Sequence, residues 1–168
     1  MAKRRIAVED LDIPDHAHRV EHGYWTSIFV DSPSEMQIHI YSPIMPSPRP
    51  RVTRRGTFMP SDYRAHCDRL ACSLAYSRGW YQGTLNQDWP SNRKMKVAMT
   101  FFSPSPSGDC DNLAKTILDA GQLHRGEQLG DELWLNDNQI MDLHVVKAPS
   151  GEDTFYMTML RISVLEDN

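Results

Sequence analysis

The chain has 168 residues, which is enough for one domain with a substantial hydrophobic core. Hydrophobic residues make up 40% and charged residues 24%, and no apolar run approaches the ~20 residues that a membrane span needs. The net charge of -4 counts against a protein that coats DNA, because contacts to phosphate need cations. The basic first residues are followed by acidic ones rather than by an apolar segment, so we expect no secretory signal and a cytoplasmic protein.

The sequence divides into two parts near residue 35. We predict an N-terminal extension over residues 1–35, in which charges are mixed and prolines interrupt the pattern, and a folded domain over residues 36–168. Within the extension, residues 24–30 are rich in aromatic and β-branched side chains. Such a segment is typical of a strand or of an arm that packs against the domain.

The next segments predict a strand, a hairpin and a helix. Apolar and polar residues alternate over residues 36–41, which indicates a half-buried strand. Prolines then hold the chain extended, and residues 52–59, broken by Gly56, are compatible with a hairpin. An apolar stripe with spacings of four, three and four predicts a helix that begins near residue 61, and we expect it to end at Gly79.

Cationic side chains are concentrated in the same region. Residues 49–55, which we call the arginine segment, contain no acid. A net-acidic protein with such a basic strip can hold a nucleic acid, although a solvated loop has the same composition. The cations of the segment are Arg49, Arg51, Arg54 and Arg55.

The second half of the sequence adds three strands and a second helix. Alternation predicts strands over residues 95–101, 139–147 and 154–165, and an apolar side predicts a helix that runs to about His124. A polar loop follows over residues 125–133. Because strands and helices are mixed without regular βαβ alternation, we predict an α+β fold. Its sheet is mixed or mostly antiparallel, with two main helices packed on it.

Carboxylates gather where the second helix begins. Asp109 and Asp111 are two residues apart, and a carboxylate at a helix start is favoured by the exposed backbone N–H groups. Lys115 follows Asp111 by one helical turn, on the same face. Asp137 lies on a second loop before a strand. If the fold joins the two loops, their oxygens form a cluster suited to a hard divalent cation, with an amine beside it.

Ordinary structural roles explain each of these residues separately. Asp at a helix start with Lys at i+4 is a common surface pair worth only ~0.3–0.5 kcal/mol. Asn and Asp around position 137 are typical turn residues. Asp142 lies on the strand face opposite to Met141 and Leu143, either merely solvated or orienting a metal ligand.

Two segments together resemble one known family. Residues 108–120 read Gly-Asp-Cys-Asp-Asn-Leu-Ala-Lys-Thr-Ile-Leu-Asp-Ala, and residues 134–142 read Trp-Leu-Asn-Asp-Asn-Gln-Ile-Met-Asp. They resemble the RusA family of Holliday junction resolvases. The family pattern is Asp-x-Asp-Asn-Leu-x-Lys-x-x-x-Asp-Ala, a variable loop, then Trp-x-Asp-Asp-x-Gln-Ile-x-Asp and a strand that ends near a Lys. Residues 46–53 resemble the family's Pro/Arg-rich loop, and the resemblance covers about residues 36–165.

The resemblance implies a structure-selective endodeoxyribonuclease. Its members are homodimers that use Mg²⁺, with Mn²⁺ as an alternative, to cut four-way DNA junctions, without an organic cofactor or a membrane. Asp109, Asp111 and Asp137 match the metal-binding catalytic aspartates, and Lys115 matches the catalytic lysine. We also expect supporting roles for three residues beside these ligands and DNA contacts from the arginine segment; the supporting residues are Asn112, Asp119 and Asp142.

The sequence departs from the family pattern in three places, and alternatives stay open. Asn136 replaces the first acid of an Asp-Asp pair, the loop over residues 125–133 is longer than usual, and residues 1–35 have no recognised counterpart. A broader nuclease for flaps and forks and a junction-binding protein without cleavage are the rival hypotheses. A metal-dependent nucleotide-sugar transferase is a weaker one, because the chain lacks a nucleotide fold.

Overall fold

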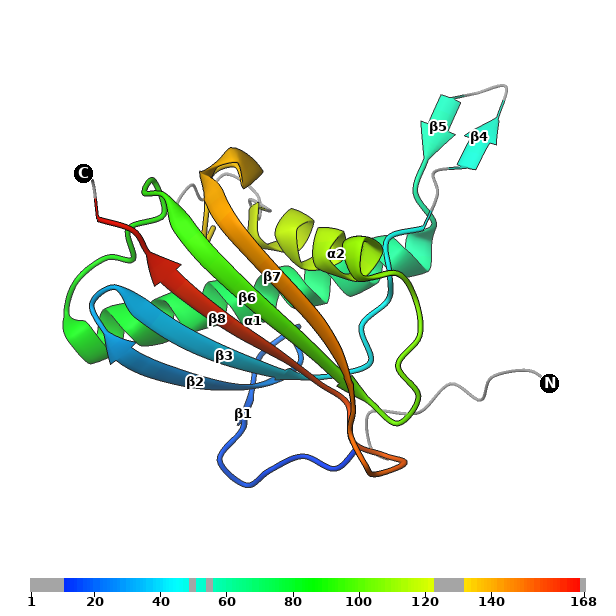
Figure 1. Ribbon diagram of the computed structural model, residues 1–168, viewed down its shortest axis with the longest axis horizontal. Helices are drawn as coiled ribbons and strands as arrows, with labels where there is room; N and C mark the ends of the chain where they lie inside the picture. The colour runs from blue at the N-terminus through cyan, green and yellow to red at the C-terminus, as the bar shows by residue number, and fades with distance from the viewer. Residues whose placement is uncertain (1–10, 49–50, 54–55, 123–131, 167–168) are drawn as a thin grey trace.

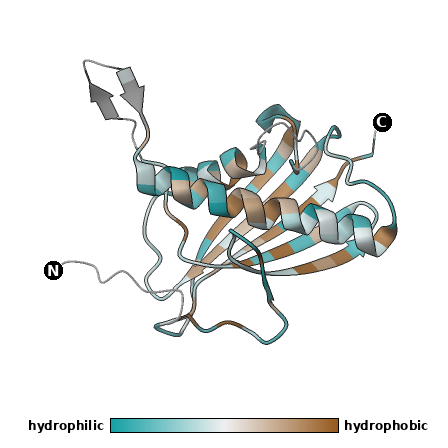
Figure 2. Cartoon of the chain, turned by 180° about the vertical axis from the view of Figure 1, so that it is seen from behind, coloured by the Kyte–Doolittle hydropathy of each residue, from teal (hydrophilic) through white to brown (hydrophobic). Residues whose placement is uncertain are grey.

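The computed structural model describes residues 11–48, 51–53, 56–122 and 132–166. Two helices lie across one face of a six-stranded sheet of order β1-β2-β3-β8-β6-β7 (Figures 1 and 2). Only the β6–β7 ladder is parallel among the described pairs. The predicted α+β class with a mixed sheet is therefore confirmed. The strands are β1 (His18–Arg19), β2 (Trp25–Ser32), β3 (Glu35–Tyr41), β6 (Met95–Ser103), β7 (Ile140–Pro149) and β8 (Met157–Val164).

Strand alternation divides the sheet into a buried and an open face. Figure 2 shows hydrophobic and hydrophilic residues alternating along the strands. Side chains such as Ile38, Met99 and Leu160 are fully buried beneath the helices. Their neighbours along each strand point to the open face, where Glu35 pairs with Arg161.

Helix α1 (Ser61–Leu85) is longer than predicted. The expected end at Gly79 is wrong, because the helix continues to Leu85 and stops at Asn86, which adopts the left-handed conformation with φ of 53°. Tyr81, beyond the glycine, is fully buried, and its hydroxyl donates to the Pro33 carbonyl at 2.6 Å. Tertiary packing thus carries the helix through a residue of low helix propensity. Among the described helices, none is both long and apolar enough to cross a membrane.

The predicted hairpin is present and projects from the body. Strands β4 (Arg51–Thr53) and β5 (Gly56–Phe58) pair antiparallel, with Val52 opposite Thr57. Figure 1 shows this hairpin standing out beyond the first turn of α1. Arg51 lies on β4, whereas Arg49, Arg54 and Arg55 lie outside the described residues.

The described part of the predicted N-terminal extension is not a separate unit. Strand β2 pairs with β3 across the expected boundary at residue 35, from Trp25 opposite Tyr41 to Ser32 opposite Glu35. Tyr24 and Ile28 are buried in the common core. The β2–β3 ladder and its apolar face therefore join the described residues on the two sides of residue 35 in one sheet and one core.

Both helices anchor the chain that leads into the hairpin. The Met45 N–H donates to His66 Nε2 at 3.1 Å, and the other ring nitrogen of His66 lies 2.6 Å from the Tyr24 hydroxyl. The Thr116 hydroxyl of α2 (Cys110–Gln122) donates to the Met45 carbonyl at 2.9 Å, and the Ser47 N–H donates to the Asn112 carbonyl at 2.9 Å. The root of the arginine segment is therefore fixed beside the start of α2.

This anchor predicts a pH-dependent stability. Burial, helped by the nearby Arg69 cation, lowers the pKa of His66 from 6.5 to about 4. The unfolded chain therefore binds a proton that the folded chain rejects between these two values. We expect the free energy of unfolding to fall by up to about 3 kcal/mol as the pH decreases from 6.5 to 4.

Urea denaturation across this pH range measures the effect. In His66→Gln the free energy of unfolding should fall less between pH 6.5 and 4, because glutamine does not titrate. His144→Gln, on the exposed surface of β7, should show the same pH dependence as the wild type. If the free energy of unfolding of His66→Gln depends on pH as in the wild type, His66 is not the group that causes the dependence.

Candidate active site along helix α2

Helix α2 is amphipathic in the way its sequence predicts. Leu113 and Ile117 are buried against the sheet, whereas Asp111 and Lys115 are exposed. The Leu113 N–H donates to the Asp109 carbonyl at 3.1 Å, so Asp109 begins the helical hydrogen-bond ladder. Both carboxylates of the Asp-x-Asp pair therefore stand in solvent at the helix start.

The loop before α2 is held from β7. Gly108 has φ of 83°, a conformation that favours glycine, and the Lys147 ammonium donates to its carbonyl at 2.6 Å. At the other end of α2, Gln122 contacts Asp137, which precedes β7. Helix α2 and strand β7 therefore run in opposite directions and are joined at both ends.

Lys115 is held by Asp119, one turn further along α2. Its Nζ lies 3.0 Å from Asp119 Oδ1. The hydrogen bond to Asp119 is the main cause that raises the pKa of Lys115, and the Asp137 charge contributes as well. Lys115 thus remains a cation at neutral pH, with Asp119 as its ion-pair partner on the same helix.

Trp134 attaches the second motif to α2. Its indole N–H donates to the Leu118 carbonyl at 3.1 Å, and its ring lies against Gly121, which has no side chain to obstruct it. The Leu133 N–H donates to the Gly121 carbonyl at 3.0 Å, and the Trp89 indole donates to the Leu133 carbonyl at 2.8 Å. These contacts fix the chain immediately before Asp137.

Asp137 opens a short 3-10 helix, η2 (Asp137–Gln139). Asn136 caps it, with its side-chain oxygen accepting from the Asn138 N–H at 2.9 Å. Gln139 accepts from the N–H of Asn136 at 2.9 Å, and its amide group donates to the Ser91 carbonyl at 2.8 Å. Asn136 therefore serves as a cap where the family pattern has an acid.

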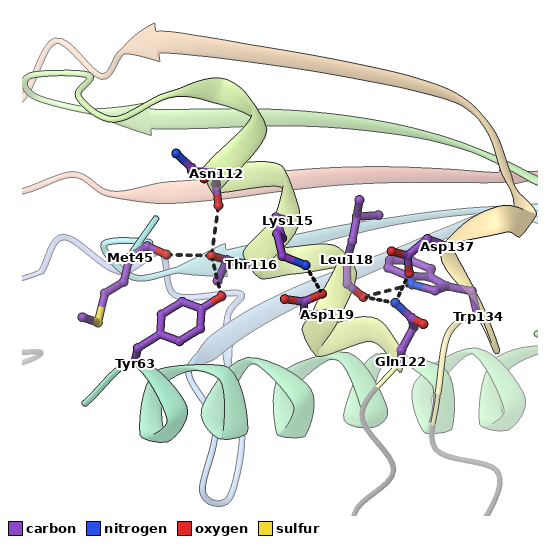
Figure 3. A network of polar contacts seen from close by, with 10 residues as sticks. All are labelled: Met45, Tyr63, Asn112, Lys115, Thr116, Leu118, Asp119, Gln122, Trp134 and Asp137. Carbon is purple, nitrogen blue, oxygen red and sulfur yellow. Dashed lines mark hydrogen bonds and ion pairs between the residues drawn. The ribbon is translucent and has the colours of Figure 1, made fainter. Parts of the chain in front are cut away.

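Asp137 itself faces the last turn of α2. Gln122 donates its side-chain N–H to Asp137 Oδ1, and Figure 3 shows Asp137, Trp134 and Gln122 at one end of the helix, with Lys115 and Asp119 further along it. The carboxylate is exposed and on the same side of the sheet as α2. It lies at the opposite end from Asp111, which precedes Gln122 by roughly 16 Å of helix rise.

The expected carboxylates thus follow α2 without meeting at one point. Among the residues that the structure describes, no three His, Cys, Asp or Glu side chains lie close enough together to hold a metal ion. Mutual repulsion of like charges favours such a separation. The donors are all carboxylate oxygens, which suit a hard divalent cation. The set therefore fits such an ion by its chemistry, while Asp137 has to move toward Asp109 and Asp111 to share one.

Two of the expected supporting residues have other surroundings. Asp142 pairs with Lys96 at 3.0 Å, and the strand register places both on the open face of the sheet, opposite to buried Val97. Strand alternation thus directs Asp142 away from α2, toward its partner Lys96. Asn112 contributes through its backbone carbonyl, which accepts from the Ser47 N–H.

The sequence motifs did not predict the roles of Gly121 and Gln122. Gly121 and Gln122 follow the quoted motif directly, and only the packing of Trp134 and Asp137 reveals their roles. The Asn136-x-x-Gln139 spacing is a recognisable capping signal that could have identified the 3-10 helix. The family pattern has a lysine near the end of this strand, where Lys147 lies, but its contact with Gly108 spans 39 residues and has no local signal.

The fold and site define an α+β protein with carboxylates and a charged amine along one exposed helix face. The family model of endodeoxyribonuclease RusA matches residues 42–159, more than two thirds of the chain. The chain belongs to the RusA endodeoxyribonuclease family, which confirms the resemblance seen in the two motifs; the family acts on Holliday junction DNA. The match includes every candidate site residue, whereas β1, β2 and β3 precede it. No curated protein sequence matches the chain.

The contact between Gly121 and Trp134 yields a stability prediction. A Cβ atom at position 121 would lie 2.6 Å from Trp134 Cε2 and 2.8 Å from Cη2, closer than atoms can pack. We expect Gly121→Ala to destabilise the protein by about 1–3 kcal/mol, as overpacked cores do. Thermal or urea unfolding measures this difference.

Gly79 provides a matched control. It also lies inside a helix, but nothing is within 4 Å of the added Cβ. Gly79→Ala should therefore stabilise the protein by roughly 0.5–1 kcal/mol through helix propensity. Equal effects of the two substitutions would contradict the proposed packing of Trp134.

Proposed function

We propose that this chain is a Mg²⁺-dependent endodeoxyribonuclease that resolves four-way DNA junctions by paired phosphodiester hydrolysis. The observation that carries the proposal is the exposed face of α2. It presents Asp109, Asp111 and a protonated Lys115, with Asp137 at its end, within the region that matches the nuclease family. A protein that only binds DNA has no need to direct a row of carboxylates at a polyanion.

Asp109, Asp111 and Asp137 would hold the cation. Each contributes an exposed carboxylate, the donor that Mg²⁺ and Mn²⁺ prefer. A bound divalent cation supplies an activated water and offsets charge on the phosphate. To share one cation with the other two carboxylates, Asp137 would have to leave Gln122. The amide of Gln122 is then available to an oxygen of the substrate.

Lys115 would neutralise the phosphate group at which the bond breaks. Its ammonium is charged at neutral pH and, with Asp119 as its described partner, has further N–H donors to offer. Such a donor stabilises negative charge that develops in the transition state. Asp119 keeps the ammonium on the face of α2 where the carboxylates stand.

The arginine segment would position the DNA backbone. Arginine contacts to phosphate orient a duplex without reading its sequence. The bonds from His66 and Thr116 to Met45, and from Asn112 to Ser47, fix the root of this segment beside α2. A phosphate held by the projecting hairpin is therefore held in register with the carboxylates.

A homodimer suits this substrate. A four-way junction presents two equivalent strands, and a two-fold dimer presents two identical sites. Each copy then cuts one strand, which leaves two duplexes.

Substitution of Asp111 separates cleavage from binding. Asp111→Asn should reduce junction cleavage at least 100-fold, because it removes a ligand charge, in the range that mutation of catalytic groups produces. The same change should keep or tighten junction binding, because it removes a negative charge that faces phosphate. Labelled junctions measure both, by gel shift in EDTA and by cleavage in Mg²⁺.

Asp142→Asn is the matched control. It makes the same change of charge on the open face, where the partner is Lys96. We expect near wild-type cleavage from this variant. Wild-type cleavage by Asp111→Asn, or an equal loss in both variants, would contradict the assignment of α2 as the active face.

A further inference from the structure

A cavity of about 410 Å³ lies beside the start of α2. The chain before the hairpin forms one wall with Pro43 and Ile44, and the loop after β6 forms another with Ser105. Lys147, which also lines it, donates to the carbonyl of Gly108, the residue before Asp109. The cavity therefore opens next to the two carboxylates that begin the candidate active site.

The walls combine apolar surface with hydroxyl groups. Phe101, Phe102 and Leu113 contribute apolar area, while none of the described lining residues is acidic. Five lining residues carry an aliphatic hydroxyl group, namely Ser42, Ser103, Ser105, Ser107 and Thr158. This composition is typical of a site for a flat heterocycle, whose face needs apolar contact and whose edge needs hydrogen bonds.

Thr158 gives the second, independent indication of a ligand. It lies on the buried face of β8, between Ile40 and Phe101 on the neighbouring strands, and is 1% exposed. Its hydroxyl has no hydrogen-bond partner among the described residues. Buried hydroxyls are almost always paired, and valine would fill this position without a polar atom. Thr158 lines the cavity, and its hydroxyl lacks the hydrogen-bond partner that a ligand held there would supply.

We propose that this cavity receives one unstacked nucleobase of the DNA strand that enters the active site. The proposal rests on the proposed function, because it takes the strand to pass Asp109 and Asp111. The Thr158 hydroxyl bonds the edge of the base, and the apolar walls contact its face. An isolated phosphate fits less well, since Lys147 is the sole cation among the described lining residues and already donates to Gly108.

The test asks whether the Thr158 hydroxyl and one particular base of the junction contribute to the same contact. The probes are four-way junctions in which single nucleotides near the branch point are replaced, one at a time, by an abasic residue. Their affinities are measured in EDTA for the wild type and for Thr158→Val. We expect Thr158→Val to weaken binding of the intact junction by about two- to tenfold, the contribution of one hydrogen bond. For one abasic junction, the one that lacks the base bound in the cavity, wild type and Thr158→Val should bind with equal affinity.

Two controls exclude an indirect effect. Thr100→Val makes the same change on the open face of β6, opposite Met159, and should leave binding unchanged. Thr158→Val should melt at or above the wild-type temperature, because it removes an unpaired buried hydroxyl.

The outcomes distinguish the two proposals. Wild-type affinity of Thr158→Val for the intact junction, or an equal loss on every abasic junction, would overturn the base pocket alone. A wild-type protein that binds no branched DNA would overturn the proposed function and the pocket together. Both proposals are supported if Thr158→Val loses affinity for the intact junction but not for the junction that lacks the base at one position.

Discussion

The indole of Trp134 lies against the part of α2 that Gly121 leaves open, and the arrangement of the site depends on this contact. The indole N–H bonds the Leu118 carbonyl, and the neighbouring Leu133 bonds Gly121. Together they bring a segment that is distant in sequence to the end of α2. The 3-10 helix that follows then places Asp137 at Gln122, near the Lys115 ammonium. Without this packing, the two halves of the acidic motif would have no fixed relation.

The charged side chains along α2 are arranged so that the carboxylates do not meet at one point. Asp111, Lys115 and Asp119 follow one another at one-turn intervals, and Lys115 pairs with Asp119. Asp137 accepts a hydrogen bond from the neutral side-chain amide of Gln122 and does not lie beside Asp109 and Asp111. Carboxylates repel one another, and a divalent cation held between them offsets that repulsion. Assembly of the ligands on binding is the consequence we propose.

Local patterns in the sequence predict most elements, because alternation and helical stripes reflect burial directly. The strand at Met36, the hairpin around Gly56 and the strand from Met95 follow from them. Long-range packing explains the failures. Tyr81 carries α1 beyond Gly79, and pairing with β3 takes β2 into the sheet. Within the site, adjacent motif residues were predictable, whereas the positions of Gln122 and Lys147 depend on contacts that no local pattern encodes.

The exposed face of α2 is the part of the molecule that we propose cuts branched DNA. The most direct measurement incubates the protein with end-labelled four-way junction, flap, three-way and linear duplex of matched sequence, with Mg²⁺ or with EDTA. We expect paired, symmetrically placed nicks in the four-way junction that require Mg²⁺, and little cutting of the other substrates. Equal cutting of flaps and three-way DNA would indicate a broader nuclease, and binding without any metal-dependent cleavage would contradict a nuclease role for α2.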